Sequence, residues 1–164
     1  YIYFKNYRKT NNLQTLLYAK KLLTSSFVCL FADIIYEKKI IKKLLKNDND
    51  VCLVIDSSKV LEGTMRVKVK KNKVIDVGSH IPVNEGHGNF IGIAKFSNNG
   101  AKILKKYLLK EKNNYKDYYT QALRKMIVND ENISYINVKK EFWKEIDTNK
   151  DFIDAKKMTK ELNI

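Results

Sequence analysis

The sequence predicts an α/β domain built on a mixed, mostly parallel sheet that is flanked by helices. Two continuous apolar runs are typical of buried strands, and amphipathic helical stretches precede and follow them. Further along the chain, apolar and polar residues alternate, which indicates a hairpin with one solvated face. A length of 164 residues with 44% hydrophobic content suits one packed domain, residues 1–164.

In the first part of the chain helices and strands alternate, which is the order of a sheet with parallel strands. The predicted elements are a short extended stretch (1–4), a helix capped by Thr10 or Asn11 with Leu13, Leu16, Leu17 and Leu23 at helical spacing, a strand buried on both faces (27–31), a helix with Ile40, Ile41, Leu44 and Leu45 on one face, a turn (47–50) and a second buried strand (51–55).

The second part of the chain adds a hairpin, further strands and three helices. The predicted elements are two hairpin strands (65–69 and 74–77) joined at Lys71-Asn72-Lys73, a strand (90–96), a helix capped by Ser97, a helix (118–128), a strand (133–138), an extended segment (143–146), and a closing helix that starts with a capping box from Thr148 to Asp151 and buries Phe152, Ala155 and Met158.

The formal net charge of +14 is compatible with nucleic acid, an anionic membrane surface or an anionic small substrate as partner. Nearly all of the excess is lysine, in pairs along helices, whereas arginine is the better reader of bases. We therefore expect no nucleic-acid partner. No apolar run approaches the ~18 residues of a membrane span. Cys29 and Cys52 lie in apolar runs, which favours reduced thiols in a cytoplasmic protein without a zinc site.

Asp33 is the first candidate for chemistry. It follows the apolar strand 27–31 and precedes a predicted helix. In open α/β sheets, ligands bind at the edge where the strands end. The alternative is that Asp33 only caps the helix that follows it.

Glu145 and Asp147 are the second candidates. They are two residues apart, so in an extended strand both side chains point to the same side. Paired carboxylates without a nearby histidine suit a hard cation such as Mg²⁺, which prefers oxygen ligands and is usually completed by substrate phosphates. This pattern predicts metal-assisted transfer at phosphorus without a protein nucleophile. Helix capping by Asp147 is again the alternative.

A glycine-rich segment, 85–96, is the third candidate. Gly92 stands inside a strand, where glycine often marks a place at which a ligand nears the backbone. Lys95 would place a cation near an anionic group, although a solvated lysine on a hairpin rim explains it as well. We interpret His87 as structural, because transfer to an existing phosphate oxyanion needs no general base.

Four segments resemble those of a known family, and they occur in the family's order. They are Thr10-Asn11-Asn12 before a leucine-rich helix, Phe31-Ala32-Asp33-Ile34-Ile35 after a strand, the stretch from His87 to Ser97, and Trp143-Lys144-Glu145-Ile146-Asp147-Thr148. Together they resemble the nucleotidyltransferases of the GT-A-like fold, and most of all the phosphocholine and 2-aminoethylphosphonate cytidylyltransferases. The resemblance spans almost the whole chain.

The resemblance implies a reaction in which CTP and a small phosphate or phosphonate give a nucleotidyl-linked product and pyrophosphate, with Mg²⁺ as cofactor. It implies that Asp33 and Asp147 hold the metal and that Glu145 completes the metal and substrate site. The residues expected to contact substrate are Asn12, Asn89, Gly92, Lys95 and Trp143. For a quaternary ammonium group, the candidates for an aromatic cage are Trp143, Phe90 and Tyr36, with core packing as the alternative.

The chain departs from the family pattern in three places. Asn89 stands where the family has Glu, Ala32 replaces a glycine before the metal aspartate, and no glycine-rich loop with Arg and Lys precedes the first helix to cradle a triphosphate. Because the first residue is Tyr1, we expect a carboxyl-terminal part that lacks the amino-terminal nucleotide-binding strand and loop and does not turn over alone. A sugar-phosphate nucleotidyltransferase and a non-catalytic binding module of the same fold stay open as alternatives.

Overall fold

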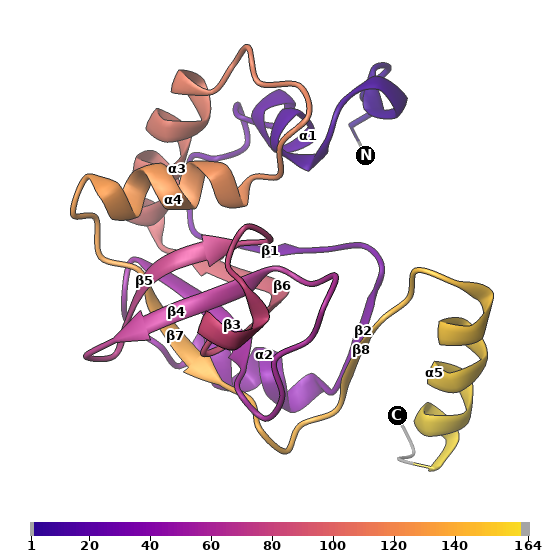
Figure 1. Ribbon diagram of the computed structural model, residues 1–164. Helices are drawn as coiled ribbons and strands as arrows, with labels where there is room; N and C mark the ends of the chain where they lie inside the picture. Colours follow the sequence, from indigo (N-terminus) through magenta and orange to yellow (C-terminus); the bar gives the residue numbers. More distant parts are fainter. Residues whose placement is uncertain (1, 162–164) are drawn as a thin grey trace.

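The computed structural model describes residues 2–161, and a six-stranded sheet forms its centre (Figure 1). The strand order is β1-β6-β3-β7-β5-β4. Its strands are β1 (Phe27–Leu30), β3 (Val51–Asp56), β4 (Arg66–Lys70), β5 (Lys73–Gly78), β6 (Gly88–Phe96) and β7 (Ser134–Asn137). A separate two-stranded sheet pairs β2 (Ile34–Tyr36) with β8 (Trp143–Glu145).

Helices flank the central sheet, so the predicted α/β domain with a mixed sheet is confirmed. They are α1 (Asn12–Tyr18), α2 (Lys38–Leu45), α3 (Asn98–Lys110), α4 (Thr120–Val128) and α5 (Asn149–Glu161), with short 3-10 helices η1 (Tyr7–Lys9) and η2 (Val83–Glu85). Within the described residues, none of the helices has the length and apolar character needed to cross a membrane. Residues 2–4 form no strand, and Tyr1 of the extended stretch expected there lies outside the described residues.

The pairing of the strands is mostly antiparallel, which corrects the expectation of a mostly parallel sheet. Among the described strands, only β3 and β7 pair in parallel. β1 and β3 run in the same direction, as the helix–strand alternation predicts, but β6 lies between them and pairs antiparallel with both. The alternation of helices and strands gives only their order along the chain. It could not show that the later strand β6 lies between β1 and β3 in the sheet.

β1 is an edge strand, so the expectation that it is buried on both faces is wrong. In the part of the chain that the structure describes, β1 pairs only with β6, and Leu30 at its end is 43% exposed. The element that follows also differs from the prediction. Asp33 precedes the short strand β2, and α2 begins only at Lys38.

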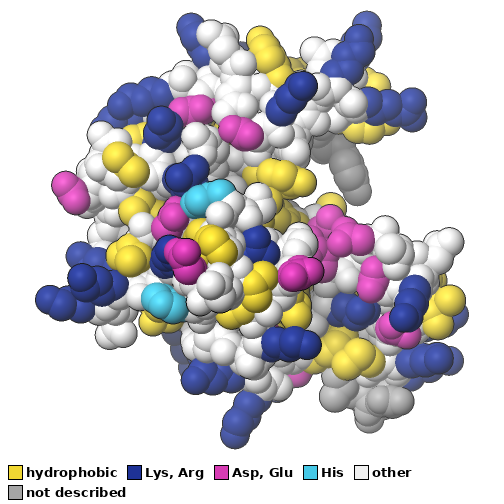
Figure 2. Space-filling model, in the orientation of Figure 1, with side chains coloured by type: hydrophobic (Ala, Val, Ile, Leu, Met, Phe, Trp, Pro, Cys, Tyr) yellow, Lys and Arg dark blue, Asp and Glu magenta, His cyan; other side chains and the backbone are white. Residues whose placement is uncertain are grey.

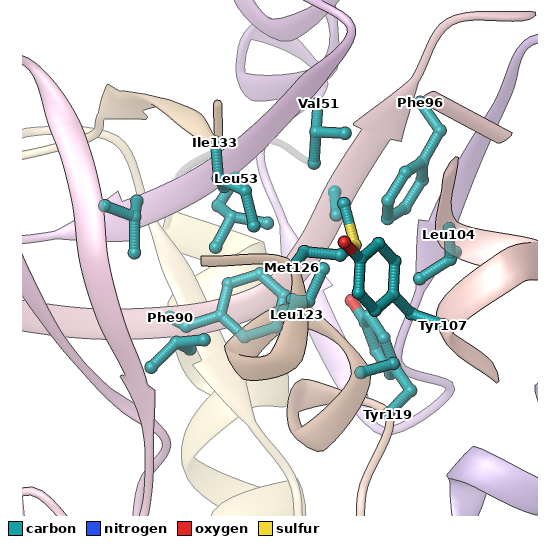
Figure 3. Close-up of a cluster of buried hydrophobic side chains, with 14 of the residues drawn as sticks. Val51, Leu53, Phe90, Phe96, Leu104, Tyr107, Tyr119, Leu123, Met126 and Ile133 are labelled. Atoms are coloured by element: carbon teal, nitrogen blue, oxygen red, sulfur yellow. The ribbon is translucent and has the colours of Figure 1, made fainter. Parts of the chain in front are cut away.

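Two apolar layers pack on the two faces of the sheet, because successive residues of β3 point to opposite sides. Val51, Leu53 and Ile55 face the layer formed with α1, α3 and α4, and part of this layer is shown in Figure 3. Cys52 and Val54 face α2 on the other side. Cys52 is fully buried, and both cysteines are free thiols as predicted.

α5 begins with the predicted capping box and stands beside the sheet rather than on it (Figure 1). Thr148 Oγ1 accepts a hydrogen bond from Asp151 N (3.2 Å), and Asp151 Oδ2 accepts one from Thr148 N (3.0 Å). Of the three residues expected to be buried, only Ala155 is. Phe152 is 55% exposed and Met158 40%, and α5 packs mainly against the short strand β8.

The capping box makes the stability of α5 depend on pH. Hydrogen bonds from Thr148 and then Lys144 lower the pKa of Asp151 to about 2. A carboxylate whose pKa is lowered by folding stabilises the folded state above its ordinary pKa, and this contribution is lost as the pH falls through the folded value. We expect the helicity of α5, followed by NMR chemical shifts, to be constant above about pH 4 and to fall below it.

Asp151→Asn should lower the helicity of α5 at neutral pH and remove this titration. α4 is the internal control, because its N-cap residue makes no side-chain capping hydrogen bond. A titration of α5 that persists in the variant would contradict the prediction.

Candidate metal centre

Three acidic side chains meet at one point of the structure. Asp33, Glu145 and Asp147 each offer a carboxylate oxygen, and these oxygens all lie within 4.8 Å of one another. The small β2–β8 sheet brings them together, since Ile34 pairs with Glu145 and Ile146 N donates to Asp33 O (2.8 Å). The two acidic segments that the sequence singles out are therefore neighbours in space. We call these three residues the acidic cluster.

The acidic cluster concentrates negative charge. Asp33 and Asp147 are exposed, whereas Glu145 is partly buried. Burial raises the pKa of Glu145, and the negative charges of Asp147, Asp33 and Asp151 raise it further. Within residues 2–161, no ion pair neutralises any of the three carboxylates. A set of oxygen ligands that repel one another fits a hard divalent cation such as Mg²⁺.

Two cavities flank the acidic cluster. The first, of about 660 Å³, lies between α1, β1 and the loop before β4. The second, of about 630 Å³, lies between that loop, the segment 139–147 and α5. Thr64, Glu145 and Asp147 line both cavities. Figure 2 shows acidic side chains gathered beside a hollow between the body of the molecule and α5. The cluster is thus open to ligands from two sides.

The first cavity has an aromatic wall and a polar rim. The rings of Phe31, Phe90 and Tyr119 meet edge to face, with centroids 5.9–6.3 Å apart. Asn12 also lines this cavity, where its Oδ1 accepts a hydrogen bond from Tyr119 N (2.8 Å) and so ties α1 to the start of α4; its contact with substrate stays a prediction.

Trp143 lies in the second cavity, where its indole Nε1 donates to Asp56 Oδ2 (2.8 Å). Phe90 belongs to the first cavity, and Tyr36 packs against the apolar layer under α2. Tyr36 and Trp143 are cross-strand partners in the β2–β8 sheet, but Phe90 lines the other cavity, so the three residues proposed as a cage do not line one cavity together. Four lysines also line the second cavity: Lys59, Lys139, Lys140 and Lys144.

Gly92 and Lys95 line neither cavity. Gly92 has φ +77°, and a Cβ there would overlap the ring of Phe31, whose N donates to Gly92 O (2.9 Å). The group that nears this backbone is thus an aromatic ring of the protein. Lys95 points to the opposite face of β6 from the first cavity, and its amine donates to Asn47 O. Strand alternation places it away from any substrate at the acidic cluster.

The side chains of Asn89 and His87 both form hydrogen bonds with backbone groups of the chain. Asn89 is fully buried, so its side chain does not reach a ligand in either cavity. His87 Nδ1 accepts a hydrogen bond from Val69 N (2.9 Å), which agrees with the structural interpretation. Thr64, at the junction of the two cavities, was not predicted. The adjacent Gly63 adopts a left-handed φ of +75°, and a glycine in a loop is a sequence signal for such a turn.

Comparisons with known proteins identify the fold. No protein-family model matches the chain, and no curated protein does. The inositol-1-phosphate CTP transferase from T. maritima superposes with a TM-score of 0.70 at 14% identity, covering 87% of this chain and 58% of that one. A putative glucose-1-phosphate thymidylyltransferase from Bacillus anthracis superposes with a TM-score of 0.69 at 13% identity. The match covers 89% of this chain and 59% of that one.

A third solved structure is the CTP:phosphocholine cytidylyltransferase from Streptococcus pneumoniae. Its TM-score is 0.73 at 15% identity, and the match covers 96% of this chain and 67% of that one. The chain therefore has the fold of GT-A-like nucleotidyltransferases, as the sequence resemblance implies. It spans about three fifths of the length of the first two structures.

Proposed function

We propose that this chain is the metal-holding part of a Mg²⁺-dependent nucleotidyltransferase. It would act on a nucleoside triphosphate, with CTP favoured, and on a small phosphate or phosphonate acceptor. The observation that carries the proposal is the convergence of Asp33, Glu145 and Asp147 where two cavities meet. The nucleotidyltransferase fold supports it, and two of the three compared structures are named for CTP.

The proposed reaction joins an acceptor oxygen to the α-phosphorus of the triphosphate. The bond from that phosphorus to the oxygen of the pyrophosphate breaks, and pyrophosphate leaves. A bound Mg²⁺ would neutralise charge on the triphosphate and orient it for in-line attack. The protein's part is to hold the cation through the acidic cluster and to place one ligand in each cavity. Because the attacking oxygen is already anionic, no protein base is required.

A sugar-phosphate or polyol-phosphate acceptor is the second candidate. Two of the compared structures are named for inositol-1-phosphate or glucose-1-phosphate. Phe90 and Trp143 line different cavities, so a cage for a quaternary ammonium group would have to use the Phe31, Phe90 and Tyr119 rings of the first cavity instead. A non-catalytic module of the same fold would bind ligands without releasing pyrophosphate.

Two measurements test the proposal. Calorimetric titration of Mn²⁺ or Mg²⁺ into the chain should show a single divalent-cation site. In the full natural protein, CTP should release pyrophosphate with phosphocholine, 2-aminoethylphosphonate or a sugar 1-phosphate, and removal of the cation with EDTA should abolish the release. Cation binding without turnover on any acceptor would favour the binding module, and no cation binding would overturn the proposal.

A further inference from the structure

The loop that joins β3 to β4, residues 57–65, is the wall shared by the two cavities. Gly63, Thr64 and Met65 line the first cavity. Residues of the same loop line the second: Ser58, Lys59, Leu61, Glu62 and Thr64. The position of this loop therefore decides the shape of both cavities where they meet the acidic cluster.

Asn89 lies between the two ends of this loop. On β6 it pairs on one side with Asp56, the last residue of β3, and on the other with Arg66, the first residue of β4. The loop thus leaves the sheet on one side of Asn89 and rejoins it on the other. The side chain of Asn89 is fully buried.

The amide of Asn89 holds the loop from within through three hydrogen bonds. Its Nδ2 donates to Lys59 O (2.6 Å), and its Oδ1 accepts from Leu61 N (2.9 Å) and from Thr64 Oγ1 (3.1 Å), whose one hydrogen it shares with Leu61 O (3.1 Å). Arg66 adds a brace from the sheet, since its Nη1 donates to Leu61 O (3.1 Å). The bonds of Asn89 reach the start, middle and end of the cavity-lining part of the loop.

We propose that Asn89 is a positioning residue that clamps the 57–65 loop and so sets how two ligands meet at the acidic cluster. The observation that supports the clamp is the set of hydrogen bonds that Asn89 makes to the loop, whereas its effect on ligands rests on the proposed function. The residue acts through Thr64, which lies on both cavities, and not by touching substrate itself. A glutamate has no N–H to donate to Lys59 O, so this clamp is specific to the amide.

Two variants test the clamp. Asn89→Ala removes all three bonds, and Thr64→Val keeps the shape of the threonine while removing its hydroxyl. Loss of a buried hydrogen bond should speed amide exchange of Leu61 by about tenfold or more in Asn89→Ala, and less in Thr64→Val. Mn²⁺ affinity should stay within about twofold of wild type, because the acidic cluster is untouched. In the full natural protein, the KM values of both substrates should rise about tenfold, with a smaller change in kcat.

Gln14→Ala is the matched control. Gln14 is a buried amide whose Nε2 donates to Lys112 O (3.1 Å) and Asn114 O (2.7 Å), and none of these three residues lines either cavity. It should lower the thermal midpoint without changing Leu61 exchange or KM. Equal KM changes in Gln14→Ala, or unchanged Leu61 exchange in Asn89→Ala, would overturn the proposal. If Asn89→Ala does not fold, Leu61 exchange in Thr64→Val decides instead, because Thr64 lines both cavities and a KM change there could come from a lost direct contact. Absence of Mn²⁺ binding in the wild type would defeat the proposed function but not the clamp.

Discussion

Asp33→Asn and Asp147→Asn should each abolish divalent-cation binding and pyrophosphate release while the fold stays intact. Asparagine keeps the shape of the side chain but removes the charge, and a hard cation depends on charged oxygen ligands. We expect Mn²⁺ affinity to fall about a hundredfold or more. Turnover in the full natural protein should fall about a thousandfold. Both carboxylates are exposed, so their loss should leave the packed core unchanged.

The same variants should relieve repulsion inside the acidic cluster. The charges of Asp147 and Asp33 help to raise the pKa of Glu145, after burial, so either change should lower that pKa. NMR titration of the Glu145 carboxyl carbon measures this shift independently of activity. Asp48→Asn, an exposed carboxylate on the turn before β3, is the control and should change neither property. Cation affinity like that of the wild type in both cluster variants would rule out the metal role.

The acidic cluster could be anticipated from the sequence because its signals are local. Asp33 ends an apolar run, and the spacing of Glu145 and Asp147 places both on one side of an extended segment. The segments that carry Asp33 and Glu145 then lie side by side, because β2 pairs with β8. The element boundaries around them were less accurate: the helix expected directly after Asp33 begins only at Lys38.

Long-range partners account for the predictions that the structure corrects. Strand alternation shows that Lys95 and Phe96 point to opposite faces, but not which face holds the cavity. A glycine in a strand marks a close approach, yet only the fold reveals that Phe31 is what approaches Gly92. Asn89 stands in a strand beside glycines and could equally face a ligand or a loop. Its burial depends on the distant segment 57–65, which no local pattern identifies.

Gly92→Ala should be the more destabilising of two matched glycine substitutions. A left-handed backbone costs an L-residue about 1–2 kcal/mol, and crowding against a packed ring adds about 1–3 kcal/mol. Gly63 has nearly the same φ, +75° against +77°, but nothing lies within 4 Å of a Cβ placed there. Gly63→Ala should therefore lower the free energy of unfolding only by the cost of the left-handed backbone, about 1–2 kcal/mol. Urea unfolding of both variants gives the two free energies, and their difference is the cost of displacing Phe31.

That difference bears on the site because the ring of Phe31 is part of the first cavity. It packs edge to face on Phe90 and Tyr119, with centroids 5.9 Å from each. A Cβ at Gly92 must push the ring toward the cavity or lift β1 from β6, so ligand affinity in that cavity should fall with stability. Phe31→Leu in the Gly92→Ala background should recover part of the loss, since the smaller side chain leaves room. If Gly92→Ala costs no more than Gly63→Ala, the ring is not held against the strand, and Gly92 has no role in shaping the cavity.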